Sequence, residues 1–294
     1  MINFHKYGYL DIKKLAQFFD NKSIKLMSFN PIWLYLWSDI YHPEIAFKGN
    51  SCYIRINVEN VGLSYFPPLG DEVSMYDAIL EIQENAKEDG IDFNMGPVDE
   101  SYYFKVLNQK INLVECKKLE SYTYLCDDIA FMKPSKVKKA KKRYDKFNKL
   151  YKNTYLKNIG KEDFTVLLEF INNWNMTSSN LSDKEYYSML NVLKASIEHL
   201  YELNLIGNIL MDDEKIYGYV IGSIFGNTAY IYQVVCDDIE GLKETLISSF
   251  AKTCGIAARY LELDSNGYDS LDLKTKIDLN PFAIEKFYST YNIE

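Results

Sequence analysis

The chain has 294 residues, with 33 Lys and Arg against 41 Asp and Glu, which gives a formal net charge of −8. Hydrophobic residues make up 47% and charged residues 25%, a composition typical of globular proteins with a substantial core. It excludes disordered, collagen-like and low-complexity chains. The length suits one large domain or two domains of about 150 residues.

The number and spacing of the cysteines and histidines limit which kinds of disulfide or metal site the chain can form. The five cysteines are scattered without a CxxC pair, and the three histidines are far apart. This pattern predicts a reducing compartment, with neither a disulfide framework nor a metal site. The N-terminal segment lacks an apolar signal region, and no apolar run approaches the roughly 20 residues that span a bilayer, so we expect a cytoplasmic protein without a transmembrane segment.

The first half alternates between helix and strand patterns. In chain order, the predicted elements are a helix over Asp11–Phe19, strands over Cys52–Val58 and Gly62–Phe66, a helix that ends at Gly90, and a strand over Ile91–Met95.

A strongly basic segment follows near the middle of the chain. Between Lys133 and Lys149 lie nine basic residues and one acid, Asp145, so the segment carries +8, and the other 24 basic and 40 acidic residues give the rest of the chain −16. Apolar residues recur there every three or four positions, at Val137, Ala140, Tyr144, Phe147 and Tyr151. Because this is the spacing of one helix face, we predict a long basic helix over about residues 134–151, between the two halves.

The second half shows a clearer alternation of helix and strand patterns. Ser182 and Glu185 form a capping box at the start of a helix that runs to about Asn204. The elements predicted after it are strands over Leu205–Met211, Ile216–Phe225 and Thr228–Val235, a helix over about Ile239–Cys254, a strand over Tyr260–Leu263 and a final helix over Pro281–Tyr291 with Asn280 as its N-cap.

This order of elements indicates a fold. A helix, an antiparallel meander, then a helix, a strand and a helix is the order of the GCN5-related N-acetyltransferase (GNAT) fold, and the first half is a poorer version of it. We therefore predict an α/β (α+β) protein with two tandem GNAT-like domains, residues 1–120 and 121–294. Each would have a mixed, mainly antiparallel sheet flanked by helices.

Several motifs carry a resemblance to a family. The chain resembles the C-terminal domain of phosphatidylglycerol lysyltransferases and its stand-alone relatives, which have tandem GNAT folds akin to the Fem-type peptidyltransferases. The matching residues are Trp33, Trp37, Asp39 and Tyr41, the run Phe66-Pro67-Pro68-Leu69-Gly70, Tyr124, Leu125, Asp128, Ala130 and Lys133 with the basic helix through Phe147, and Lys274, Lys276 and Pro281. The resemblance implies transfer of an acyl or aminoacyl group, with aminoacyl-tRNA as the donor.

The chain also departs from the family pattern. Val234 and Val235 stand where the family has a Glu-Lys pair, Lys142 replaces an Asn, and Glu262-Leu263-Asp264 replaces Asn-Arg-Glu. Either the substrate differs from the family norm or catalysis has been lost.

The GNAT fold implies where an acyl donor would bind. The strand before the central helix splays open, its backbone fixes the donor, and amides at the helix N-terminus hold the pyrophosphate of coenzyme A. The corresponding donor-binding candidates are Val234, Val235, Gly241, Leu242 and Lys243.

The same loop carries features that disfavour coenzyme A. Asp237, Asp238 and Glu240 surround its glycine, and the family's glycine-rich form is absent. Because these negative side chains repel negatively charged phosphates, this loop is poorly suited to bind a polyphosphate. A helix-capping role for Asp237 or Asp238 is the alternative.

Acyl transfer to an amine needs a base near the nucleophile and an acid for the leaving group. Glu262 and Asp264 lie two residues apart at the end of a predicted strand, so either can serve as the base, and both can instead be ordinary surface residues. Tyr232, on the preceding strand, is a candidate hydrogen-bond donor, with an aromatic core role as the alternative.

An aminoacyl-tRNA donor would favour the basic helix, because Lys and Arg contacts to phosphates release counterions. The polyanion-binding candidates are Lys136, Lys138, Lys139, Lys142 and Arg143. A solvated or interdomain-packing helix and an anionic lipid contact are the alternatives. Lys274 and Lys276 are candidates to hold an acidic group of the acceptor.

Three functions follow from these observations. The first is a GNAT-superfamily acyltransferase that transfers an aminoacyl group from aminoacyl-tRNA to an amine or hydroxyl acceptor, which would be a small molecule, a peptide or a lipid. The second is a catalytically silent GNAT-like binding protein. The third is an N-acyltransferase that uses acyl-coenzyme A. None of them requires a metal or a resident cofactor.

Overall fold

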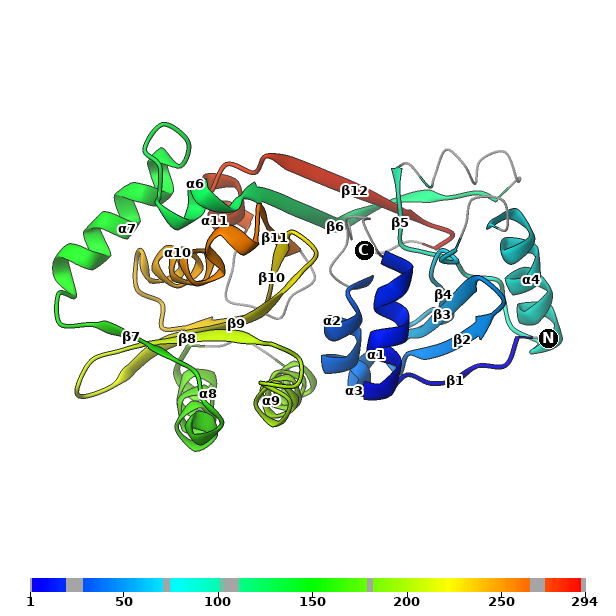
Figure 1. Ribbon diagram of the computed structural model, residues 1–294, viewed down its shortest axis with the longest axis horizontal. Helices are drawn as coiled ribbons and strands as arrows, with labels where there is room; N and C mark the ends of the chain where they lie inside the picture. The colour runs from blue at the N-terminus through cyan, green and yellow to red at the C-terminus, as the bar shows by residue number, and fades with distance from the viewer. Residues whose placement is uncertain are drawn as a thin grey trace. The chain divides into compact units, whose positions relative to one another are not determined.

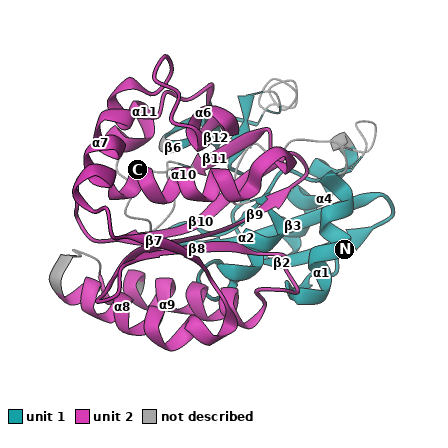
Figure 2. Ribbon diagram, turned by 60° about the vertical axis from the view of Figure 1, so that its left-hand side comes forward, with its two compact units in different colours: residues 1–120, 285–294 teal, residues 121–284 magenta. Residues whose placement is uncertain are grey.

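The computed structural model describes residues 2–19, 29–70, 75–100, 102, 111–178, 182–264 and 273–291. The chain forms two compact units (Figure 2): unit 1 comprises residues 1–120 and 285–294, and unit 2 comprises residues 121–284. The division at residue 120 is also the predicted one, and residues 285–291, predicted with the second half, are assigned to unit 1.

Unit 1 is built on a four-stranded antiparallel sheet in the order β1–β2–β3–β4. Its elements are β1 (His5–Lys6), α1 (Tyr9–Ala16), the 3-10 helix η1 (Gln17–Phe19), α2 (Pro31–Leu36), α3 (Ser38–Tyr41), β2 (Glu44–Lys48), β3 (Ser51–Val58), β4 (Gly62–Tyr65), α4 (Met75–Glu88) and β5 (Val98–Asp99). Its core includes Ile79 and Ile82 from α4 together with Tyr53 and Tyr65 from the sheet.

Two strands contribute residues to both units: β6 (Val114–Leu125) and β12 (Ala283–Ser289). In unit 1, the last part of β12 pairs antiparallel with β5.

Unit 2 contains a second sheet, which runs in the order β6–β11–β10–β9–β8–β7. Its elements are α6 (Cys126–Ala130), α7 (Lys138–Leu150), β7 (Tyr155–Asn158), η3 (Lys161–Asp163), α8 (Phe164–Ser178), α9 (Asp183–Glu198), β8 (Ile206–Met211), β9 (Ile216–Phe225), β10 (Thr228–Cys236), α10 (Leu242–Cys254), η4 (Gly255–Ala257), β11 (Tyr260–Asp264) and α11 (Leu273–Asp278). Helices α8 and α9 cover one face of the sheet and α10 covers the other (Figure 1).

The core of unit 2 explains why α7 forms where it does. Ala140 and Phe147 of α7 are fully buried against Leu242 and Leu246 of α10. Each large apolar side chain buried in this way contributes about 1.5–3 kcal/mol. The apolar residues whose spacing predicted a helix therefore include those that pack against α10.

Most predicted elements of the second half are present. The capping box of Ser182 and Glu185 opens α9, and the three-stranded meander forms as β8, β9 and β10. The mixed, mainly antiparallel sheets flanked by helices are therefore confirmed.

The basic helix is shorter than predicted and belongs to unit 2. It has 13 residues and begins after Val137, its N-cap. Pro134 lies in the preceding turns, where the backbone amides of Lys136 and Val137 both donate hydrogen bonds to the carbonyl of Lys133.

The predicted final helix was wrong, because its residues form strand β12. Side chains along β12 alternate, with Phe287 and Ser289 buried and their neighbours more exposed, which is the period of a strand. Asn280 has a φ of 53°, so it terminates α11 in a left-handed conformation instead of starting a helix.

The prediction of a strand over Ile91–Met95 was also wrong. In this segment only Met95 makes a strand-like bridge, to Tyr65. Helix α8 and strands β6 and β7 were not predicted.

Candidate functional site

Strands β10 and β11 of unit 2 pair over a short stretch only. Their parallel register ends with Tyr230 opposite Glu262, although β10 continues to Cys236. The register of β10 on its other neighbour, β9, shifts between Ile231 and Gln233. The strand that precedes α10 therefore pairs with β11 only as far as Tyr230, and its register on β9 shifts directly after that point.

A buried polar cluster lies at this point of divergence. Glu262 and Tyr232 are each 2% exposed, and the Tyr232 hydroxyl lies 2.6 Å from Oγ of Ser223. Burial, together with the charges of Glu262 and Tyr232, raises the pKa of Tyr230 well above its usual range. Tyr230 lies directly opposite Glu262 in the register of β10 and β11.

The third predicted catalytic residue, Asp264, is the last residue of β11. Its backbone lies opposite Ser121 of β6. Its side chain lies outside the described part of the structure.

The predicted donor positions on β10 are apolar and enclosed. Val234 and Val235 are fully buried, with Val234 in the core cluster that includes α10. No polar side chain replaces the family's Glu-Lys pair at these two positions.

The N-terminus of α10 is covered by α7. Gly241, the N-cap, is buried at a φ of 89°, and a Cβ at this position would overlap the carbonyl oxygen of Arg143 and lie 2.9 Å from Cβ of Phe147. The next residue, Leu242, is fully buried, and Lys243 is partly exposed. The backbone of α7 thus occupies the space in front of Gly241.

Acidic side chains lie at the N-terminus of α10, which is the positive end of its dipole. Glu244, in its first turn, accepts a hydrogen bond of 2.5 Å from Nε of Arg143, and Glu240 pairs with Lys146. Carboxylates are favoured near a helix N-terminus because they oppose its dipole.

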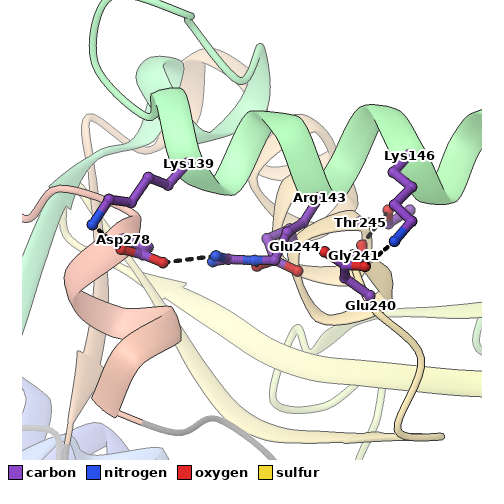
Figure 3. Close-up of polar contacts among 8 residues, drawn as sticks. All are labelled: Lys139, Arg143, Lys146, Glu240, Gly241, Glu244, Thr245 and Asp278. Carbon is purple, nitrogen blue, oxygen red and sulfur yellow. Dashed lines mark hydrogen bonds and ion pairs between the residues drawn. The ribbon is translucent and has the colours of Figure 1, made fainter.

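Arg143 joins three helices (Figure 3). Besides Glu244 of α10, it donates a hydrogen bond of 2.7 Å from Nη1 to Asp278 of α11, which also lies 3.5 Å from Nζ of Lys139. The side chains of Glu244 and Asp278 are only 3% and 7% exposed. Burial opposes ionisation of Asp278, but the hydrogen bond and charge of Arg143 outweigh it and lower the pKa of this carboxyl.

The predicted polyanion-binding residues therefore divide into two sets. Arg143 and Lys139 are engaged by Asp278 and Glu244. Lys136, Lys138 and Lys142 are exposed, and within the described ranges no ion pair is found for them. Lys142 lies one turn from Lys138 on the same helix face, and Lys149 continues this face two turns further.

The predicted acceptor-binding lysines also differ from each other. Lys274 is exposed on α11, whereas Lys276 is 4% exposed and its carbonyl accepts a hydrogen bond from the Tyr124 hydroxyl. The two residues lie on different sides of this short helix.

Sequence reasoning missed Tyr230, Ser223 and Asp278. The first two face each other because the two-residue turn Gly226-Asn227 fixes the register of β9 and β10. The turn lies between the predicted strands Ile216–Phe225 and Thr228–Val235, so the pairing of Tyr230 with Ser223 could have been derived from the sequence. The contact between Arg143 and Asp278 joins residues 135 positions apart, and no local sequence pattern predicts it.

No helix in the described parts of the chain combines the length and hydrophobicity needed to cross a membrane. Among the same residues, no group of His, Cys, Asp or Glu side chains is arranged to hold a metal ion.

Comparison with solved structures identifies the fold. A conserved protein of unknown function from Bacteroides thetaiotaomicron is similar at a TM-score of 0.88 and 17% identity, covering 98% of this chain and 99% of the other. L-PGS from Bacillus licheniformis is similar at a TM-score of 0.64 and 13% identity, covering 96% and 92%. A tandem GNAT protein from the clavulanic acid biosynthesis pathway is similar at a TM-score of 0.52 and 10% identity, covering 98% of each chain. The predicted relation to tandem GNAT folds is therefore confirmed.

A search of curated protein sequences found no significant match. The family model described as "Phosphatidylglycerol lysyltransferase, C-terminal" matches residues 29–264, which is most of the chain. The match extends from α2 of unit 1 to the last residue of β11, and so includes the buried cluster around Glu262 and all of α7. The chain belongs to the family of phosphatidylglycerol lysyltransferase C-terminal domains.

Proposed function

We propose that this protein is an aminoacyltransferase, which takes an aminoacyl group from aminoacyl-tRNA and transfers it to an amine or hydroxyl acceptor. The observation that carries the proposal is the position of α7. This helix covers the N-terminus of α10 and keeps an exposed cationic face. Family membership supplies the reaction class.

The covered helix end argues against coenzyme A as the donor. A pyrophosphate at a helix N-terminus needs unsatisfied amide groups and open space in front of them. Here the backbone of α7 packs closely against Gly241, and the carboxylates of Glu240 and Glu244, paired with Lys146 and Arg143, already lie at this end of the helix. An aminoacyl-tRNA presents no pyrophosphate at this point.

The exposed face of α7 suits a nucleic-acid donor. Lys138, Lys142 and Lys149 follow one side of the helix over 11 residues, which is about 16 Å at 1.5 Å per residue. Lysines in such a row contact successive phosphates and release counterions without reading sequence.

The buried cluster supplies groups for the transfer step. In the proposed reaction, the acceptor nitrogen or oxygen bonds to the carbonyl carbon of the aminoacyl ester, and Glu262 takes the proton that the acceptor loses. The bond from that carbon to the ribose oxygen breaks, and Tyr232 protonates the departing oxygen. A proton passed from Glu262 to Tyr232 restores both groups.

One observation favours a catalytically silent binding protein instead. Val234 and Val235, where the family carries a charged pair, are fully buried and apolar. A silent protein would retain the cationic face of α7 but not the transfer reaction.

The test measures transfer directly. Purified protein is incubated with tRNA charged with labelled amino acids and with a cell extract that supplies acceptors, and label is followed into acceptor-bound product. We expect product with the wild type, and a loss of roughly 100-fold in rate with Glu262→Gln, in line with the usual contribution of a general base.

A matched variant separates chemistry from binding. Glu88→Gln changes an exposed carboxylate of α4 and should leave the rate unchanged. Retention of salt-dependent tRNA binding without any transfer would favour the silent binding protein. Stimulation by acetyl-coenzyme A, with no requirement for tRNA, would contradict the proposal.

A further inference from the structure

Unit 2 carries a pocket of about 570 Å³ that the proposed reaction does not use. Its walls are α8, the hairpin between β8 and β9, and Asp237 directly after β10. Small-molecule sites commonly have volumes of about 300–1,000 Å³, so this pocket is large enough for a small organic ligand.

The floor of the pocket is apolar and partly aromatic. Phe170 and Trp174 of α8 are 9% and 8% exposed, and Ile209 and Met211 of β8 lie beside them. A hydrogen bond of 2.8 Å from the Trp174 indole to the carbonyl of Cys236 fixes this ring. Such a floor can pack against a hydrocarbon chain and can attract a cation through the aromatic rings.

The walls of the same pocket are acidic. Its lining contains two lysines, Lys157 and Lys215, and six acidic residues: Asp163, Glu169, Asp212, Asp213, Glu214 and Asp237. The lining therefore has a net charge of −4.

Both lysines of the lining are already paired with acidic residues of the same lining. Lys157 pairs with the buried Asp163. The ammonium of Lys215 lies 2.9 Å from Oδ2 of Asp237 and 4.4 Å from the centre of the Tyr217 ring. A carboxylate on one side and an aromatic ring on the other is a favourable setting for an amine.

Four acidic residues remain after these pairs. Asp212 accepts hydrogen bonds from the Tyr217 hydroxyl and from the backbone amides of Glu214 and Lys215, which lower its pKa and keep it ionised at neutral pH. Glu169, Asp213 and Glu214 are exposed, and the described ranges contain no ion pair to any of them.

We propose that this pocket binds aliphatic polyamines, with the alkyl chain on the floor of Phe170 and Trp174 and the ammonium groups against the carboxylates of Glu169, Asp213 and Glu214. A ligand with several ammonium groups on a flexible chain matches both features of the pocket. An anionic or purely apolar ligand matches only one or neither. The proposal does not depend on the transfer reaction.

The test is a calorimetric titration of the whole protein with spermidine at about 50 mM salt. We expect a single site in the wild type. The triple variant Glu169→Gln/Asp213→Asn/Glu214→Gln should weaken binding at least about threefold, since it removes three exposed charge pairs with the ligand. The matched control, Glu84→Gln/Glu88→Gln/Asp92→Asn, removes three exposed carboxylates of unit 1 and should change the affinity less than twofold.

A second readout locates the ligand. The chain has three tryptophans, and of these only Trp174 lines the pocket. Its indole NH signal, identified as the one missing in Trp174→Phe, should move when spermidine is added, and the signals of Trp33 and Trp37 should not. Mg²⁺ at equal ionic strength should compete poorly, because it gains nothing from the apolar floor.

Several outcomes would overturn the proposal. These are no binding by the wild type, equal weakening by both triple variants, equal competition by Mg²⁺, or movement of the Trp33 and Trp37 signals in place of Trp174. The second and third would mean diffuse attraction of a polycation to an acidic protein. All of these leave the proposed transfer reaction unaffected, because that reaction is measured separately.

Discussion

Two sides of helix α7 are both rich in basic residues, but these residues differ in whether they are paired with acidic side chains. On the inner side, Arg143 is partly buried and pairs with Glu244 and Asp278. Lys139 and Lys146 pair with Asp278 and Glu240, although their side chains are 79% and 58% exposed. On the outer side, Lys138, Lys142 and Lys149 are exposed to solvent. A run of basic residues is therefore not one functional unit: Arg143 joins three helices of the fold, whereas the outer lysines are exposed and available to a partner.

The inner side should carry the largest stability effect. Arg143→Ala leaves the buried Glu244 without its cation and Asp278 with only the more distant Lys139, so we expect a loss of about 3–5 kcal/mol in the free energy of unfolding. Urea denaturation measures it. Lys142→Ala, on the outer side, is the control and should stay within about 0.5 kcal/mol. Equal effects of the two substitutions would remove the distinction between the sides.

Gly241 tests how closely α7 packs on α10. Gly241→Ala places a Cβ against the carbonyl of Arg143 at a positive φ, and we expect a loss of about 2–4 kcal/mol. Gly226→Ala is the matched control, because its φ is also positive, at 60°, but no atom lies within 4 Å of the added Cβ. It should cost about 1 kcal/mol. If both cost the same, α7 does not close the end of α10.

The outer side should govern binding to RNA. Lys138→Ala/Lys142→Ala/Lys149→Ala should weaken tRNA binding roughly tenfold and lower the slope of log affinity against log salt by about 2–3, one phosphate contact per lysine. Filter binding over a range of salt concentrations measures both. Lys13→Ala/Lys87→Ala/Lys194→Ala, three exposed lysines from other helices, is the control and should leave the slope unchanged.

The smallest effect concerns acid stability on the inner side. The folded-state pKa of Asp278 lies below its ordinary value of 3.8, so its stabilising contribution is present above that value and is lost as the pH falls through the folded pKa. We therefore expect the stability difference between wild type and Asp278→Asn to shrink below about pH 3.8. Urea midpoints measured from pH 7 to pH 3 test this. A difference that stays constant would mean that Asp278 is not held ionised by Arg143.

Local sequence patterns predicted the second half of the chain well, for a physical reason. The capping box of Ser182 and Glu185 and the turn at Gly226-Asn227 act over two to four residues, so their signals are complete in the sequence. The segment after Asn280 failed because its apolar residues fit a helix as well as a strand, and pairing with a distant strand decided between them.

The candidate site could be predicted only in part. Glu262 and Tyr232 were proposed as candidates from their strands, and in the structure Glu262 lies opposite Tyr230 and Tyr232 lies two residues further along β10. The hydroxyl partner of Tyr232, Ser223, and the acidic partners of Arg143 were not identified, because each lies on another element and is brought near by packing.

By itself, the sequence determined the composition of the core, the meander of unit 2, the amphipathic character of α7 and the family to which the chain belongs. Only the tertiary structure decided which cations are already paired, that the start of α10 is covered, and that an acidic pocket with an aromatic floor lies beside α8. The reason is that a local pattern fixes which face of an element is apolar, whereas the charge that remains free depends on which distant residue packs against it.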